Sequence, residues 1–194
     1  MRQILSTAGA LILFLSGLPY IIDIIKGKTH PNLVTWITWT LLNVINAVAA
    51  ASTGAISTAI LAASAGLTTA IIVTMGFKHG VKRYTRFDII CQALALVGIV
   101  IWRLTASPDL AIAIALSVEL IAAFPTWRHA WVSPHAETWE GFGISIPAGL
   151  LTIASLTNFT FVTLAYPIVL VGNCAVIVSI ILGRRRQLKL TPQS

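Results

Sequence analysis

The segment Pro31-Asn32-Leu33-Val34-Thr35-Trp36 recurs, as a pattern, 103 positions later as Pro134-His135-Ala136-Glu137-Thr138-Trp139. Both segments follow P-x-x-x-T-W, and each stands immediately before a long apolar stretch. Each also follows a proline placed late in the preceding apolar stretch, Pro19 in the first copy and Pro125 in the second. A single short pattern recurs easily by chance, but a match at equivalent places between apolar stretches indicates an internal repeat.

The composition is that of a membrane protein. Hydrophobic residues make up 57% of the 194 residues, charged residues make up 10%, and the mean hydropathy is +0.88. Six acidic residues do not supply the polar surface that a soluble domain of this length needs, which disfavours a soluble enzyme, a nucleic-acid-binding module and a disordered scaffold. Cys91 and Cys174 both lie in apolar stretches, which favours buried side chains over a disulfide or a zinc site.

Stretches long enough to cross a bilayer occur seven times. A hydrocarbon core of about 30 Å needs roughly 20 apolar residues in a helix. The sequence predicts spans at about 4–25, 33–52, 57–77, 87–104, 109–130, 139–157 and 161–183. The repeat matches the first three spans to the last three and leaves the fourth as a connector, so both copies have the same orientation.

We therefore predict an all-α membrane protein with seven transmembrane helices, arranged as two parallel three-helix-bundle repeats joined by a linker helix. The first bundle covers residues 1–80, the linker span 81–107, the second bundle 108–186 and a cytoplasmic tail 187–194. The rich supply of small residues, such as those at 49–54, suits closely packed membrane helices.

The basic residues gather on one predicted face. Eleven of the thirteen lie there, and only Arg2 and Arg103 lie on the other. By the positive-inside rule, the amino terminus is expected outside and the carboxyl terminus in the cytoplasm, in a multi-pass protein of the plasma (inner) membrane. The run 183–189 is basic enough for a nucleic-acid patch, but an anchor on anionic lipid is favoured, and no nucleic-acid partner is expected.

Seven spans in a 3+1+3 order, an outside amino terminus, and Pro19 and Pro125 near the cytoplasmic end of each bundle's first helix give a sequence that resembles the PQ-loop superfamily. Members include the SWEET sugar facilitators, the lysosomal amino-acid exporters and the KDEL-receptor-like proteins. The resemblance implies two parallel repeats around a central path for a solute. It matches the family's asparagine in the third helix of a bundle to Asn173, with Ser64 or Gly66 in the first copy.

Four polar residues fall at similar depth in three spans, and we predict that they form a substrate-binding site near the bilayer centre. They are Asn43 and Asn46 in the second span, Glu119 in the fifth and Asn173 in the seventh. The alternative for each asparagine is a hydrogen bond that joins two helices. A carboxylate in the membrane is costly unless it is neutralised or partnered, so Glu119 is expected to couple transport to protons.

The two matched prolines predict a mechanical role. Pro19 and Pro125 each remove a backbone hydrogen bond, which loosens one helical turn and provides paired hinge points for a cytoplasmic gate. Kinks that serve packing alone are the alternative. Nearby, Asp23 is expected to pair with a basic residue. His129 and Glu137 lack the spacing of a metal-binding motif, so no metal and no cofactor are expected.

The function favoured by these features is a small-solute carrier for a sugar, an amino acid or a related metabolite, which works by alternating access between two bundles. A seven-helix receptor or sensor that binds a small ligand without transport is the alternative. An enzyme is disfavoured because the sequence lacks HExxH, GxSxG and a second catalytic group beside Glu119. The expected partners are a small-molecule substrate, protons and the lipid bilayer, and the oligomeric state is left open.

Overall fold

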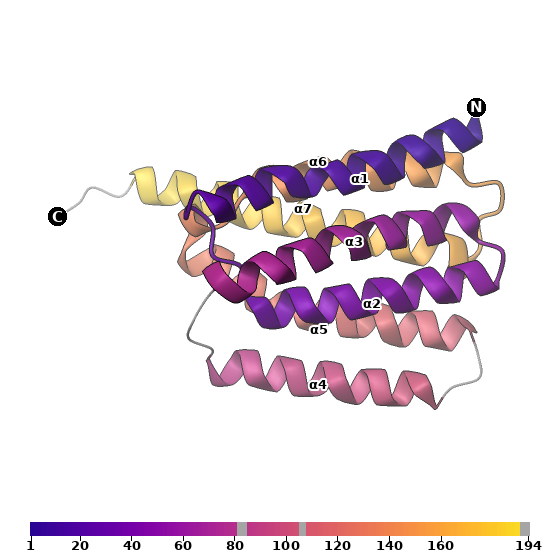
Figure 1. Cartoon of the computed structure of the whole chain (residues 1–194), viewed down its shortest axis with the longest axis horizontal. Coiled ribbons are helices and arrows are strands. Elements are labelled where there is room, and N and C mark those ends of the chain that lie inside the picture. Colours follow the sequence, from indigo (N-terminus) through magenta and orange to yellow (C-terminus); the bar gives the residue numbers. More distant parts are fainter. Residues whose placement is uncertain (81–84, 105–107, 191–194) are drawn as a thin grey trace.

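The computed structural model describes residues 1–80, 85–104 and 108–190, and within these ranges the chain is all-helical, without a strand (Figure 1). Its elements are α1 (Arg2–Ile25), α2 (Leu33–Ser52), α3 (Ile56–His79), α4 (Arg86–Arg103), α5 (Pro108–Val132), the 3-10 turn η1 (Pro134–Ala136), α6 (Trp139–Ser155) and α7 (Phe161–Leu190). The predicted all-helical class is confirmed. Both ends of the predicted linker 81–107 and the last residues of the predicted tail lie outside the described ranges.

Glycines end the first two helices in the same way. Gly27 has φ 68° and Gly54 has φ 77°, a left-handed conformation that glycine adopts without steric cost. The backbone N–H of the residue after each glycine donates a hydrogen bond to a helix carbonyl. Lys28 donates to Asp23 at 2.9 Å, and Ala55 donates to Ala50 at 2.9 Å. This closure satisfies carbonyls that the helix end leaves without partners.

Helix α7 extends beyond the predicted span, which ends at residue 183. Its continuation to Leu190 carries three arginines, which are good helix formers. Two of them hold this end in place: Arg184 Nε donates to the Trp131 carbonyl at 3.2 Å, and Arg185 Nη2 donates to the Glu137 carbonyl at 2.7 Å. The first residues of the predicted tail, 187–190, are therefore helical.

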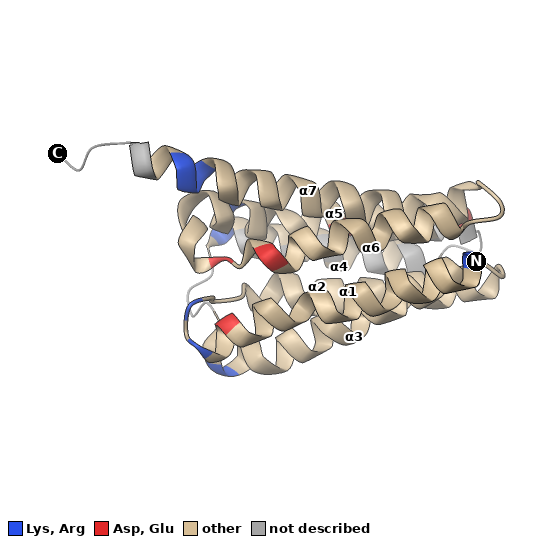
Figure 2. Cartoon of the chain, turned by 90° about the horizontal axis from the view of Figure 1, so that it is seen from above, with Lys and Arg blue, Asp and Glu red and all other residues tan. Residues whose placement is uncertain are grey.

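The helices form two layers (Figure 2), α1–α3 in the first and α5–α7 in the second. In the first layer, α3 packs against both α1 and α2; in the second, α7 packs against both α5 and α6. Between the layers, α1 packs against α6 and α2 packs against α5, while α4 lies beside α5. The two layers thus repeat the same pattern of neighbours, helix for helix.

Among the residues that the structure describes, four helices, α1, α2, α3 and α7, are long and apolar enough to cross a membrane. The face of α1 that points away from the other helices is also apolar, because Leu11, Leu15, Leu18 and Ile22 are each more than two fifths exposed. A run of exposed aliphatic side chains along a helix suits contact with lipid. Length, composition and surface together support a membrane protein.

Glycine sets the distance between the two layers where α1 meets α6. A Cβ atom at Gly9 would lie 2.8 Å from the Ala148 carbonyl oxygen and 2.8 Å from Oγ1 of Thr152. A backbone carbonyl in a helix cannot move aside as a flexible side chain can. Close approach of the two backbones therefore requires glycine at this position.

We expect Gly9→Ala to lower the free energy of unfolding in detergent by about 1–3 kcal/mol, the usual cost of overpacking. The matched control is Gly172→Ala, because a Cβ at Gly172 meets no atom within 4 Å. The control should leave stability unchanged or raise it by up to about 1 kcal/mol through better helix propensity. Equal stability of the two variants would contradict the close contact between α1 and α6.

Candidate functional site

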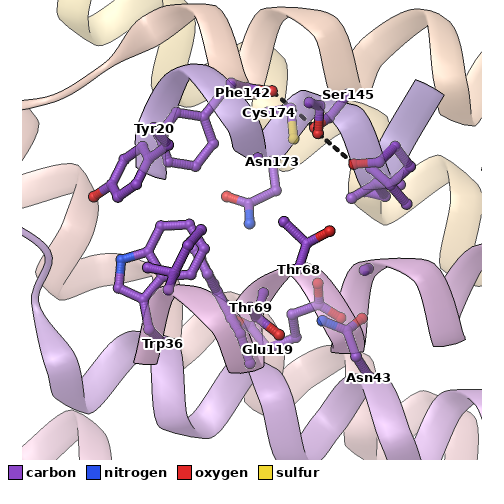
Figure 3. Close-up of a pocket in the computed structure, with 18 residues that line it drawn as sticks. Tyr20, Trp36, Asn43, Thr68, Thr69, Glu119, Phe142, Ser145, Asn173 and Cys174 are labelled. Atoms are coloured by element: carbon purple, nitrogen blue, oxygen red, sulfur yellow. Dashed lines mark hydrogen bonds between the residues drawn. The ribbon is translucent and has the colours of Figure 1, made fainter. Parts of the chain in front are cut away.

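A cavity of about 80 Å³ lies between the two layers and is lined by all the described α-helices except α4 (Figure 3). A single water needs roughly 10–15 Å³ measured in this way, so the space holds several water-sized groups. We call it the central cavity. Its polar lining residues are Ser16, Asn43, Thr68, Thr69, Glu119, Ser145 and Asn173.

The structure brings together three of the four polar residues that the sequence singles out. Asn43 from α2, Glu119 from α5 and Asn173 from α7 all line the central cavity, although 130 positions separate the first from the last. Asn46 does not line it. The Asn46 side chain is 2% exposed, and among the described residues it makes no hydrogen bond. Its role as a binding residue stays a prediction that a position in the cavity lining does not support.

Aromatic donors occupy the side-chain oxygens of both lining asparagines. Trp127 Nε1 donates to Asn173 Oδ1 at 2.9 Å, and the Tyr166 hydroxyl donates to Asn43 Oδ1 at 2.5 Å. An indole N–H is only a donor, so the Trp127 bond fixes which way the Asn173 amide faces. Figure 3 shows that amide pointing into the cavity. Its NH₂ group therefore remains as a donor toward the cavity.

Glu119 is the one carboxylate among the lining residues that the structure describes. The side chain is 4% exposed, and its Oε2 atom is buried without a hydrogen-bond partner. The Glu119 backbone is held separately, because its carbonyl accepts from Trp39 Nε1 at 3.3 Å. The carboxyl group is thus carried by a fixed helix, and its Oε2 atom lacks a hydrogen-bond partner, which is costly in a buried place.

Four aromatic rings form one wall of the cavity. Tyr20 packs against Trp36 with ring centroids 4.8 Å apart, and Trp36 packs edge-on against Trp39 at 5.2 Å. Phe142 from α6 completes the group at 5.8 Å from the Tyr20 ring. These rings were not predicted as part of the site, because tryptophans beside helix ends are typical of membrane interfaces.

A partly buried polar cluster lies beside the aromatic wall, at the end of the molecule that carries Lys26, Lys28 and Arg184–Arg186 (Figure 2). We call it the basic-end cluster; it consists of Tyr20, Asp23, His129, Glu137 and Thr138. Glu137 Oε2 accepts from the Tyr20 hydroxyl at 2.9 Å, and Glu137 Oε1 lies 2.7 Å from His129 Nδ1. Thr138 Oγ1 donates to Asp23 Oδ2 at 2.9 Å. The cluster joins the first layer to the second.

The basic-end cluster departs from the expectation for Asp23: within the described residues, its side chain hydrogen-bonds Thr138 and pairs with no basic residue. No local sequence pattern identifies the cluster, because Tyr20 and Glu137 are 117 positions apart. The second P-x-x-x-T-W segment marks the start of α6, and the packing of α6 against α1 brings it beside the end of α1. Within the described ranges, no group of three metal-ligating side chains is present.

The opposite end of the molecule is more open. A cavity of about 730 Å³ lies there, lined by the start of α1, the α2–α3 connection and the α6–α7 connection. We call it the vestibule. Leu13 and Ala65, which line the central cavity, belong to an apolar cluster with Leu61 and Tyr166; Val162 packs on that cluster and lines the vestibule. An apolar layer thus separates the two spaces.

Both prolines predicted as hinges lie inside continuous helices, Pro19 in α1 and Pro125 in α5. Pro19 immediately precedes Tyr20, and Pro125 lies one turn before His129, so each is next to a member of the basic-end cluster. Their action as hinges stays a prediction.

Comparisons of the chain with family models, curated proteins and solved structures gave no match.

Proposed function

We propose that this protein is a small-solute carrier in which two three-helix bundles, α1–α3 and α5–α7, move around the central cavity. The observation that carries the proposal is the position of this cavity. Helices of both bundles line the cavity. The basic-end cluster lies on one side of it, and the apolar layer and the vestibule lie on the other. Substrate sites of alternating-access carriers lie between repeats in this way.

The arrangement of neighbours supports a parallel repeat with α4 as the connector. When α1, α2 and α3 are matched with α5, α6 and α7, the α1–α3 contact corresponds to the α5–α7 contact. The α2–α3 contact likewise corresponds to the α6–α7 contact. The same matching turns the α1–α6 contact into the α5–α2 contact. A two-fold axis along the membrane normal produces such exchange, and it is the arrangement that the PQ-loop resemblance implies.

In the proposed orientation, the basic-end cluster faces the cytoplasm and the vestibule faces the outside. Lys26, Lys28, Lys78, Arg86 and Arg184–Arg186 are all at the ends of helices on the proposed cytoplasmic side. Such an excess of Lys and Arg is typical of cytoplasmic loops. In this orientation, the structure corresponds to a state closed toward the cytoplasm.

The proposal is tested by uptake into proteoliposomes that contain the purified protein. Radiolabelled solutes of three classes (sugars, amino acids and amines) are offered to protein-containing and protein-free vesicles. A carrier accumulates at least one of them above the protein-free control and shows counterflow, in which an internal solute accelerates entry of the external one. Saturable binding without uptake or counterflow would instead favour the receptor alternative.

A further inference from the structure

We propose that the ligand of the central cavity is a small protonated amine that carries a neutral hydrogen-bond acceptor, such as a hydroxyl group, and no carboxylate. The inference rests on the proposed function, because it assigns a substrate class to the same site. It excludes sugars, which carry no charge, and ordinary amino acids, which bring a carboxylate of their own.

Charge is the first reason. Among the described lining residues, Glu119 supplies a carboxylate, and none is Lys, Arg or His. Glu119 Oε2 has no hydrogen-bond partner in a side chain that is 4% exposed. A buried carboxylate needs a partner of opposite charge or a proton to offset its loss of hydration. An ammonium group that enters the cavity would provide both the charge and the missing donor.

The aromatic wall is the second reason. Tyr20, Trp36 and Phe142 present their rings beside the polar residues in Figure 3. Aromatic faces attract organic cations, and the attraction grows where water is excluded. Sugars also stack on aromatic rings and their hydroxyl groups can donate to a carboxylate, but they leave the charge of a buried carboxylate without a counter-charge. The two features together favour a cationic ligand over a neutral one.

The asparagine amides determine the rest of the ligand. The oxygens of Asn173 and Asn43 are occupied by Trp127 and Tyr166, which leaves NH₂ donors at the cavity wall. A hydroxyl or carbonyl oxygen on the ligand would accept from these donors. A ligand carboxylate would also accept, but it would bring a second negative charge beside Glu119 without any cationic lining residue to balance it.

Ethanolamine, ethylene glycol and glycine test these requirements at nearly constant size. Binding to the purified protein is measured by isothermal titration calorimetry at pH 7, with sodium chloride as the control for ionic strength. We expect ethanolamine to bind at least tenfold more tightly than ethylene glycol or glycine. Equal or tighter binding of ethylene glycol or glycine would overturn the proposal. Ethanolamine binding that sodium chloride abolishes in direct competition would identify an inorganic-cation site and would also overturn it.

Glu119→Gln provides the matched variant, since it keeps the shape of the side chain and removes its charge. We expect this variant to bind ethanolamine with about tenfold lower affinity, the loss expected when a hydrogen bond to a charged group is removed. Glu140→Gln removes a carboxylate that does not line the cavity and should bind like the unaltered protein. Unaltered ethanolamine binding in a folded Glu119→Gln protein would refute the assigned contact.

The outcomes also separate this inference from the carrier proposal. Uptake and counterflow of a sugar or an amino acid, without ethanolamine binding, would leave the carrier proposal intact and remove the amine inference. Ethanolamine binding that depends on Glu119, without uptake or counterflow in proteoliposomes, would leave the ligand class intact and remove transport.

Discussion

Replacing Glu137 with alanine is expected to open the basic end of the molecule. Glu137 is 1% exposed and joins Tyr20 of α1 to His129 of α5 through its two carboxylate oxygens. Its removal leaves both groups without this partner in the closed state, whereas water can solvate them in an open one. We expect this loss to cost the closed state about 1–3 kcal/mol in total, so the open state should gain roughly 5–150-fold in population.

The native thiol of Cys174 reports this opening. Cys174 lines the central cavity and is 5% exposed, and neither it nor Cys91 takes part in a disulfide. In a Cys91→Ser background, a small membrane-impermeant methanethiosulfonate reagent applied from the basic end should label Cys174 at least roughly fivefold faster in the Glu137→Ala protein. Glu140→Ala is the control, and it should not change the rate. Equal rates in the two variants would show that the basic-end cluster does not close the cavity.

Replacing Glu119 with glutamine is expected to abolish the dependence of transport on a proton gradient while the protein stays folded. Glu119 is the ionisable carboxylate of the described cavity lining and lacks a partner for Oε2. Either a proton or a bound cation neutralises it, so each transport cycle should exchange one for the other. Glutamine has the same shape and stays neutral throughout the cycle.

The measurement compares solute uptake into proteoliposomes with and without an imposed pH difference. The unaltered protein and the Glu140→Gln control should respond to the gradient, and the Glu119→Gln protein should not. Thermal unfolding in detergent should be unchanged or shifted upward, because a neutral glutamine costs less to bury than a carboxylate. A Glu119→Gln protein that responds to the gradient like the control would assign proton coupling to another group.

The sequence predicted the helices well and the site in part. Runs of apolar residues define the helices, and counting along each run gives the depth of Asn43, Glu119 and Asn173. Counting does not show which neighbour a residue faces. Asn46 lies three positions from Asn43, about 60° away around the helix, and this rotation is enough to take it out of the cavity lining. The end of α7 was missed because charged residues end a membrane span without ending a helix.

The aromatic wall and the basic-end cluster were beyond prediction for another reason. Their members come from both layers, so the contacts exist only once α1 has packed against α6. Tyr20, Trp36 and Glu137 each have an ordinary local interpretation as an interfacial or solvated residue. Only the packing of the two layers brings them together as the aromatic wall and the basic-end cluster beside the central cavity.

The central claim, that the cavity opens alternately to the two sides, is tested most directly by labelling Cys174 from each side with the basic end free and then locked. Asp23 and Thr138, which are hydrogen-bonded across the layers, are both replaced by cysteine in the Cys91→Ser background and joined by a short thiol cross-linker. The same protein without cross-linker is the control. Alternating access predicts that Cys174 is labelled from both sides in the control. In the locked protein, it predicts labelling from the vestibule side alone, at a rate equal to or higher than that of the control from the same side. Labelling from the same single side in both proteins would contradict alternating access.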